Sequence, residues 1–418
     1  MLQWKRLKKL PVVVGWVLLG FLWVGCGTQE TAVSEPDENV LIAENTVEEP
    51  TETAVPTTSP TETASPTAVP ATVTIAPTET PTKIPPTTTP TPLPRIATSD
   101  LFSLYSTEPV VAHGEEGAVD SWLTDPGALF YHDGLFHMFH NGLSGWPAKA
   151  GVFYSVSESG RDWTRMTEEP LFMLSDIEYV SYTGLVTSGL VAEDGSWVLY
   201  FYTIDGPSWP LPGGAIGRLT APEPTGPWTA DEDFLLQPGG EGSWDDFAVR
   251  EPSVVQTENG YRMYYAGVTQ NQSMIGLATS EDGKSWVKFT DATLEDPAFA
   301  ESAPILMGSR EGGSWDAFNV MQPRVQKSSD GWVMAFSSML ALGNGGSRMH
   351  GFAISEDGVG GWMRSNEAVI TRRLIPRSSD SWATAFLYQD GVYFYYFESN
   401  GQNGSNVYLA TYEGTLSD

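Results

Sequence analysis

The pattern of apolar and polar positions changes once along the chain, near residue 100. From about Asp100 onward, short segments alternate between apolar and polar residues and are rich in aromatic side chains, which is typical of β-strands. Glycine-containing turns separate these segments, and no stretch has the period of a long amphipathic helix. The pattern therefore predicts an all-β domain over residues 99–418.

One hairpin pattern recurs five times within this domain. In each copy a strand ends in an Asp-Gly or Asn-Gly turn, and an aromatic strand follows. This is a strong local signal for a β-hairpin, because such turns require positive φ. The turns span residues 131–134, 192–195, 257–260, 328–331 and 388–391. A third strand follows, most clearly after the third and fourth turns.

The spacing of the copies predicts the architecture. Five equivalent positions at the start of the copies are Pro126, Ser188, Pro252, Pro323 and Thr384. Units of about 60 to 70 residues with three or four strands are typical of propeller blades. The last copy is short at its C-terminal end, and residues 101–112 precede the first. We therefore predict a five-bladed β-propeller whose ring is closed by an N-terminal strand from this segment, which removes an exposed sheet edge.

Residues 27–98 have a different composition. They consist mainly of Thr, Pro, Glu, Ala and Val, without a hydrophobic period. Such a segment buries too little apolar surface to offset the entropy of the chain, and its prolines favour an extended conformation. We predict a disordered Thr/Pro-rich stalk that acts as a spacer.

Residues 1–26 have the features of a secretion signal. Basic residues at positions 5–9 precede an apolar run over residues 10–24, which is shorter than a comfortable membrane span. The run ends at Gly25-Cys26, and this ending resembles the lipobox of bacterial lipoproteins. We therefore predict lipidation at Cys26, a cell-surface location, and membrane contact through the lipid anchor only. Ordinary signal cleavage and an uncleaved anchor are the alternatives.

Charge limits the classes of partner. The chain has 22 basic and 52 acidic residues, a formal net charge of -30. This balance opposes binding to nucleic acid and to anionic lipid headgroups. The histidines have no spacing typical of a metal site, so we expect neither a metal ion nor another cofactor. We expect a monomer.

Candidate site residues follow from the repeat. The first strand of each propeller blade lines the central funnel. The residues at or beside the five equivalent positions are Asp125, Thr187, Glu251, Gln322 and Ala383. Two of them are carboxylates.

Two of these segments resemble a known enzyme family. Residues 122–130, Trp-Leu-Thr-Asp-Pro-Gly-Ala-Leu-Phe, are similar to the first-blade motif of the invertase and fructanase group, glycoside hydrolase family 32. Residues 249–254 resemble its Arg-Asp-Pro motif, with Glu251 in place of Asp. The wider pattern over residues 100–414 also resembles families 43 and 130. The resemblance implies hydrolysis of glycosidic bonds in a carbohydrate, with Asp125 as base or nucleophile and Glu251 as electrostatic stabiliser.

The general acid does not follow the family pattern. The resemblance would place it on the fourth blade at Met321 or Gln322, and neither residue can donate a proton as an acid. Four other carboxyl groups are possible substitutes, and no spacing selects among them: Glu301, Glu311, Asp316 and Glu398. Two hypotheses therefore stand, a surface glycosidase and a non-catalytic glycan-binding lipoprotein that has lost the acid. A phosphorylase would need a basic phosphate cradle, for which only Arg250 and Arg324 are candidates.

Further residues are candidates for contacts with a sugar. Arg250, Gln322 and Arg324 are placed by the repeat near the funnel, where the arginines could bind an anionic sugar or neutralise the acids. Trp146 and Trp209 stand next to prolines in loops, where an indole can present a flat face to a sugar ring. His140 is a further candidate, with a packed position in its strand as the alternative.

Overall fold

The computed structural model describes residues 95–98, 101–146, 148–208, 212–339, 348–371, 374, 381–401 and 404–417. The chain divides into two units, Met1–Pro85 and Pro86–Asp418, and every described residue belongs to the second. The predicted signal peptide with Cys26, residues 27–94 of the predicted stalk, and Trp209 lie outside the described residues. Within the described ranges, no helix has the length and apolar character needed to cross a membrane.

The described chain is built of strands, which confirms the all-β prediction. Its only helical elements, within the ranges given above, are two 3₁₀ turns, η1 (Leu174–Asp176) and η2 (Pro297–Phe299). The strands of the first repeat are β3 (Leu123–His132), β4 (Leu135–Leu143), β5 (Gly151–Ser157), β6 (Thr164–Arg165) and β7 (Phe172–Met173). The second repeat forms β8 (Thr183–Val191), β9 (Trp197–Ile204), β10 (Ile216–Ala221) and β11 (Thr229–Ala230).

The remaining repeats follow the same plan. The third forms β12 (Ala248–Thr257), β13 (Gly260–Val268), β14 (Ser273–Ser280), β15 (Val287–Lys288) and β16 (Pro304–Leu306). The fourth forms β17 (Asn319–Ser328), β18 (Gly331–Met339), β19 (Met349–Ser355) and β20 (Met363–Ser365). The fifth forms β21 (Thr384–Gln389), β22 (Val392–Gly401) and β23 (Gly404–Glu413). Two short strands precede them, β1 (Arg95–Ile96) and β2 (Ser103–Leu104).

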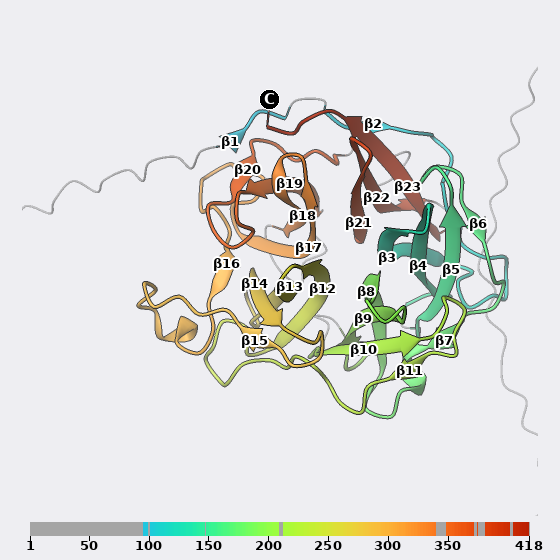
Figure 1. Ribbon diagram of the computed structural model, residues 1–418, viewed down its shortest axis with the longest axis horizontal. Helices are drawn as coiled ribbons and strands as arrows, with labels where there is room; N and C mark the ends of the chain where they lie inside the picture. Colours follow the sequence, from blue (N-terminus) through green and yellow to red (C-terminus); the bar gives the residue numbers. More distant parts are fainter. Residues whose placement is uncertain are drawn as a thin grey trace, which may run out of the picture. The chain divides into compact units, whose positions relative to one another are not determined.

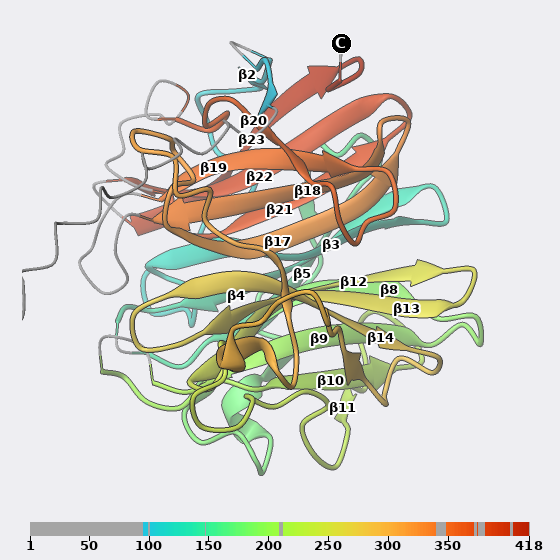
Figure 2. The same cartoon turned by 90° about the vertical axis from the view of Figure 1, so that its left-hand side faces the viewer.

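The repeats are arranged around a common axis. Consecutive main strands within each repeat pair antiparallel, and β3, β8, β12, β17 and β21 lie nearest the centre in Figure 1. The second, third and fourth repeats each form a separate sheet. The fifth and first are joined into one sheet by a parallel pair between Ser405 and Leu123. In Figure 2 the hairpins between first and second strands gather toward one end of the axis.

The turns follow the chemistry expected of the hairpins. In Asp133–Gly134 and in Asp390–Gly391 both residues have positive φ, as a tight two-residue hairpin turn requires. In the third and fourth repeats only the glycine, Gly260 or Gly331, has positive φ. It comes after the two-residue turn and pairs with the last residue of the preceding strand. Glycine is favoured at all these places because the left-handed region costs it nothing.

Apolar clusters fill the spaces between neighbouring repeats. The interleaved aromatic and aliphatic side chains face both ways from each sheet, so each sheet contributes to two clusters. One buried pair represents each cluster, with one residue from each of the two neighbouring repeats. In chain order, starting with the cluster between the first and second repeats, the pairs are Phe139 and Leu199, Tyr200 and Met263, Tyr264 and Met334, Phe352 and Tyr395, and Tyr396 and Met138. The last of these pairs joins the fifth repeat to the first.

The segment before the first repeat pairs with the last one. Strand β2 lies antiparallel to β23, with Ser103 opposite Thr411, and Val111 forms a further bridge to Val407. The segment 101–112 therefore supplies an outer strand to the short fifth repeat, as the sequence predicts.

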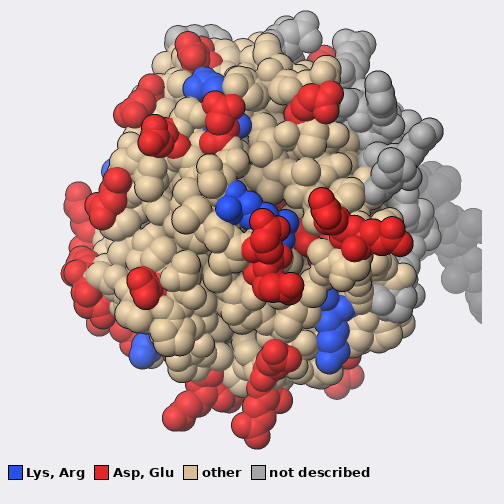
Figure 3. Space-filling model, turned by 90° about the vertical axis from the view of Figure 1, so that its right-hand side faces the viewer, with Lys and Arg blue, Asp and Glu red and all other residues tan. Residues whose placement is uncertain are grey.

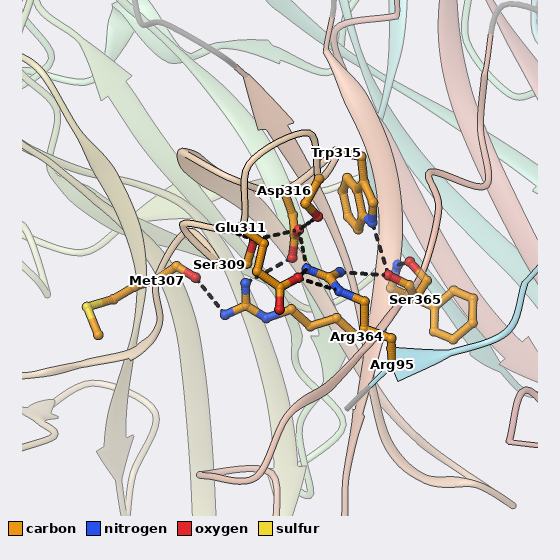
Figure 4. Close-up of polar contacts among 10 residues, drawn as sticks. Arg95, Met307, Ser309, Glu311, Trp315, Asp316, Arg364 and Ser365 are labelled. Carbon is orange, nitrogen blue, oxygen red and sulfur yellow. Dashed lines mark hydrogen bonds and ion pairs between the residues drawn. The ribbon is translucent and has the colours of Figure 1, made fainter. Parts of the chain in front are cut away.

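The folded part also includes residues assigned by sequence to the end of the stalk. Strand β1 pairs in parallel with β20. Ile96 is buried in an apolar cluster, and Arg95 lies 3.0 Å from Asp316 on one side while Arg364 lies 2.9 Å from it on the other (Figure 4). These partners lie more than 200 residues away, so the local composition of residues 27–98 could not reveal them.

The outer surface carries the acidic excess of the sequence. On the face shown in Figure 3, Asp and Glu side chains are spread widely, and the few Lys and Arg side chains lie among them. No broad basic region is visible on this face.

Candidate active site

Each of the first four repeats has an irregularity at the predicted funnel position. The pairing register of the first strand shifts between Asp125 and Ala128, Val186 and Ser188, Arg250 and Ser253, and Met321 and Arg324. Such β-bulges redirect side chains and are common next to active sites. Glu251 and Gln322 lie in the bulges themselves with φ of 57° and 54°, which is unusual for residues other than glycine. The repeat thus places the same irregularity beside Asp125, Thr187, Glu251 and Gln322, at equivalent positions of four first strands.

An axial cavity confirms that the first strands face the centre. The cavity has a volume of about 230 Å³ and is lined by residues of all five first strands. Its lining includes Gly127, Ser188, Ser253, Arg324 and Ala385, which follow the bulges along their strands.

Asp125 is a buried carboxyl group held by one amide. Its side chain is 6% exposed, and Asn141 Nδ2 donates to Oδ1 over 2.8 Å. The same Asn141 bonds the N–H and C=O of Val186 in the second repeat, so the partner of Asp125 is itself fixed. Burial raises the pKa of Asp125 to about 7, and the Glu398 charge acts in the same direction. Asp125 is therefore poised to exchange a proton near neutral pH.

Glu251 has a different environment. Its Oε2 accepts a 2.8 Å hydrogen bond from the backbone N–H of Gln322, and its Oε1 lies 3.9 Å from Nη1 of Arg348. These contacts hold the Glu251 side chain against the fourth repeat.

Gln322 is occupied by contacts within the chain. Its Nε2 donates to the carbonyl of Trp382 over 2.6 Å, and its Oε1 accepts from Ser337 over 2.9 Å. The side chain therefore fixes the bulge and the segment before β21, rather than offering a free amide to a sugar. Met321 beside it is buried, so the fourth repeat supplies no acid from its first strand.

Arg324 interacts electrostatically with both carboxyl groups. Its guanidinium donates to the carbonyls of Thr384 and Pro323, each over 2.8 Å, and its charge acts on both Asp125 and Glu251. It is buried, and burial lowers its own pKa. The predicted alternative, a cation that neutralises the acids of the funnel, fits these contacts better than direct binding of a sugar.

The other residues predicted to contact a sugar differ in their exposure. Arg250 is partly buried, and its Nε donates to the carbonyl of Gly213 over 2.9 Å. His140 is fully buried, with its ring nitrogens 2.8 Å from Thr124 Oγ1 and 3.1 Å from Ser155 Oγ. A substrate cannot reach it, because it is a packed residue of β4. Trp146, by contrast, is 43% exposed.

Of the four substitute acids, three lie away from Asp125. Glu301 is exposed. Glu311 and Asp316 belong to the cluster of ion pairs around Arg95 and Arg364 (Figure 4). Glu398 is the one of the four whose charge acts on Asp125, where it raises the pKa. The structure therefore selects one carboxyl group where spacing in the sequence could not.

Three residues near the site were not predicted, namely Asn141, Tyr202 and Arg348. Glu398 was one of the four substitute acids that the sequence left open, and its charge acts on Asp125. Asn141 could have been found, and Glu398 selected, because each lies seven residues after the glycine of its hairpin turn, Gly134 or Gly391. Arg348 follows a Gly-rich stretch with no repeating pattern. Within the described ranges, no three His, Cys, Asp or Glu side chains are placed to hold a metal ion.

Comparisons with known proteins point to one group. Residues 118–344, more than half of the chain, match the family model for the glycosyl hydrolases family 32 N-terminal domain. No curated protein matches the sequence. Among solved structures, a glycosyl hydrolase from Bacteroides ovatus is similar, with 15% identity and a TM-score of 0.57 over 76% of this chain and 96% of that one.

Two further structures have the same level of similarity. A family 117 glycoside hydrolase from the marine bacterium Zobellia galactanivorans has 15% identity and a TM-score of 0.52, over 76% of this chain and 92% of that one. A structure whose title concerns the family 130 mannoside phosphorylases, and hydrolases among them that target β-1,2-mannosidic linkages in Candida mannan, has 15% identity and a TM-score of 0.56 over 78% and 99%. At these identities the structures show a shared fold. The match over residues 118–344 shows that the chain belongs to the family of the glycosyl hydrolases family 32 N-terminal domain.

Proposed function

We propose that this chain is an extracytoplasmic glycoside hydrolase that cleaves glycosidic bonds in an oligo- or polysaccharide. The observation that carries the proposal is the pair of buried carboxyl groups, Asp125 and Glu251, at the register shifts of two first strands, with Arg324 close enough to interact with both charges. Family membership supports a carbohydrate as the substrate class. Fold alone would not, since related folds serve many functions.

Glycoside hydrolysis uses one protonated carboxyl group at the leaving oxygen and one carboxylate that acts on water or the anomeric carbon. Asp125 and Glu251 would supply these two carboxyl groups. Burial raises the pKa of Asp125 to about 7, which suits a group that transfers a proton near neutral pH. Glu251 contacts Arg348 and a backbone N–H.

We also propose that the domain is a five-bladed β-propeller with a closed ring. Three observations support this number: five repeats, five large apolar clusters of which one joins the last repeat to the first, and an axial cavity lined by all five first strands. The pairing of β2 with β23 supplies the closing strand.

The anchoring of the protein is a separate proposal that rests on the sequence. Residues 1–26 would direct export, Cys26 would carry the lipid, and the Thr/Pro-rich segment would hold the propeller away from the membrane. Metabolic labelling with a fatty acid tests it. We expect label on the native chain and none on Cys26→Ser; equal label on both would contradict the lipid anchor.

The second candidate function is glycan binding without catalysis. It is favoured by the residues that stand where the resemblance would place an acid: Met321 is buried, and the Gln322 amide bonds Trp382 and Ser337. A binding protein of this kind would hold a glycan in the funnel and leave it unchanged.

A screen of purified protein against a glycan library separates the two functions. The hydrolase predicts turnover of at least one glycan, with a loss of about 10²-fold or more in Asp125→Asn and in Glu251→Gln. Glu281→Gln, which changes an exposed turn residue, is the matched control and should retain full turnover. Glycan binding without turnover in the native protein would instead establish the binding function.

A further inference from the structure

The axial cavity is not used by the proposed hydrolysis. Asp125 and Glu251 are not among its lining residues, although the residues that follow them along β3 and β12 are. The lining extends along the first strands to Gln256 and Lys327, which are exposed and lie close to the hairpin turns. These turns gather toward one end of the axis, as Figure 2 shows. The cavity therefore opens at the hairpin end, and the carboxyl groups lie beyond its inner end.

The charge of the cavity is opposite to that of the chain. The charged residues of its lining are Arg324 and Lys327, and the lining contains no Asp or Glu. The whole chain has 52 acidic and only 22 basic residues. A cavity whose low-dielectric walls carry charges of one sign attracts ions of the other sign. An anion is therefore the class of ligand that this cavity favours.

Arg324 supplies a buried cation at the inner end. The residue is 5% exposed, and its donors Nε and Nη1 bond the backbone carbonyls of Thr384, Pro323 and Glu251. Within the described ranges, Nη2 donates no hydrogen bond and the guanidinium forms no ion pair. Asp125 and Glu251 act on it only at longer range. Since buried charges are normally paired, Nη2 is the donor that remains for a ligand in the cavity.

Two serine hydroxyls in the lining are further donors. The Oγ of Ser188 accepts from the backbone N–H of Val254 over 2.8 Å, and the Oγ of Ser253 accepts from that of Val325 over 2.9 Å. Each hydroxyl thus fixes the first strand of the next repeat and keeps its own proton to donate. Among the described residues, neither proton has an acceptor.

The size of the cavity limits the ligand. Its volume is about 230 Å³. Pockets for drug-sized ligands are typically about 300–1,000 Å³, so an oligosaccharide is too large. A water molecule takes up about 30 Å³, so a small ion with a few waters fits.

We propose that the axial cavity is a binding site for a small oxyanion, which enters past Lys327 and is held by Arg324 at the inner end. The planar guanidinium suits the oxygens of sulfate, phosphate and carboxylate alike, because its N–H groups form a fork of matching geometry. The hydroxyls of Ser188 and Ser253 add hydrogen bonds. The site does not depend on glycoside hydrolysis, and its ligand is not the glycan.

Binding of three probe anions to the native full-length protein tests the site. Sodium sulfate, phosphate and acetate are each titrated by calorimetry in buffers of equal ionic strength. We expect saturable binding of at least one of them below about 10 mM, with one ion per chain. The anion that binds most tightly shows whether an inorganic oxyanion or a carboxylate is preferred.

Two lysine variants give a matched comparison. Lys327→Glu places a carboxylate at the opening of the cavity and should weaken binding about tenfold or more. Lys284→Glu makes the same change in net charge at an exposed turn residue outside the lining, and it should leave the affinity within about twofold. Both lysines are exposed, so neither change removes a buried contact.

The inner end is tested by location of the ion. Selenate is an oxyanion with a strong anomalous X-ray signal, and in crystals of the protein it should lie within hydrogen-bond distance of Arg324. Selenate bound only elsewhere would overturn the site. So would a native protein that binds none of the three anions, or equal weakening in Lys327→Glu and Lys284→Glu. Glycan turnover enters none of these measurements, so the hydrolase and the anion site can fail separately.

Discussion

Buried carboxyl groups occur in two regions of this molecule, and their surroundings differ. In the outer ion pairs, Asp120, Asp245 and Asp316 each contact a cation from the fourth strand of their repeat at 2.7 to 2.9 Å, namely Arg165, Lys288 and Arg364. At the axis, Asp125 has one amide as its hydrogen-bond donor, and Glu398 has an oxygen without a partner among the described residues.

The pKa shifts follow these surroundings in opposite directions. Hydrogen bonds and the charges of Arg95 and Arg364 hold the pKa of Asp316 below its usual value, although burial opposes them. Burial and the charge of Glu398 raise the pKa of Asp125 to about 7. The outer pairs therefore fasten the first, third and fourth repeats, whereas burial holds Asp125 at the axis in a state that costs stability and permits proton transfer.

The largest effect is expected from breaking an outer pair. Asp316→Ala leaves Arg95 and Arg364 without their shared carboxylate, and removing one partner of a buried pair costs about 3–5 kcal/mol. Chemical denaturation measures the loss. If the variant is as stable as the native protein, the outer pairs do not fasten the fold.

The second prediction is that removing a carboxyl group at the axis stabilises the fold, whereas removing one from an outer pair destabilises it. The folded pKa of Asp125 is raised above its ordinary value of 3.8, so its contribution favours the fold below about pH 4 and is lost as the pH rises toward 7. Asp125→Asn removes this penalty and keeps an acceptor for Asn141. We expect a gain on the order of 2–4 kcal/mol at pH 8 and little change at pH 4.

Denaturation of native protein and Asp125→Asn at both pH values checks this sign. A variant that is less stable than the native protein at pH 8 would mean that the Asp125 charge stabilises the fold, as the Asp316 charge does.

The smallest effect concerns the buried histidine beside the site. Burial and the charge of Arg165 lower the pKa of His140 to about 3, so its contribution is present above pH 6.5 and is lost as the pH falls. Acid should destabilise the native protein through this group by about 1–3 kcal/mol at pH 4.5. The stability of His140→Gln at pH 7.5 serves as its own reference. On acidification this variant should lose less stability than the native protein. Equal losses would show that His140 does not titrate in this range.

Much of the fold could be predicted from the sequence because its signals are local. Strand alternation and Asp-Gly turns are set by neighbouring residues, and the repeat multiplies each signal five times. The place of Arg95 and Ile96 could not be predicted, because it depends on Asp316 and Ser365, which are distant in the chain.

The site was predicted only where the repeat marks it. Asp125 and Glu251 lie at marked positions next to prolines, and the structure brings both to the axis. Glu398 lies on a second strand and Arg348 lies in a loop. The direction in which their side chains point depends on how neighbouring repeats are aligned, which the sequence does not show. His140 shows the converse, since a polar residue near the marked strand is enclosed by Thr124 and Ser155.

Turnover per folded molecule tests the central claim most directly. One glycan that the native protein cleaves is offered to Asp125→Asn and to Asp316→Asn, and each rate is divided by the folded fraction measured in the same buffer. The account predicts a fall of about 10²-fold or more for Asp125→Asn and a change within about threefold for Asp316→Asn. Full turnover in Asp125→Asn, or an equal fall in both variants, would contradict the assignment of chemistry to the axis and of fastening to the outer pairs.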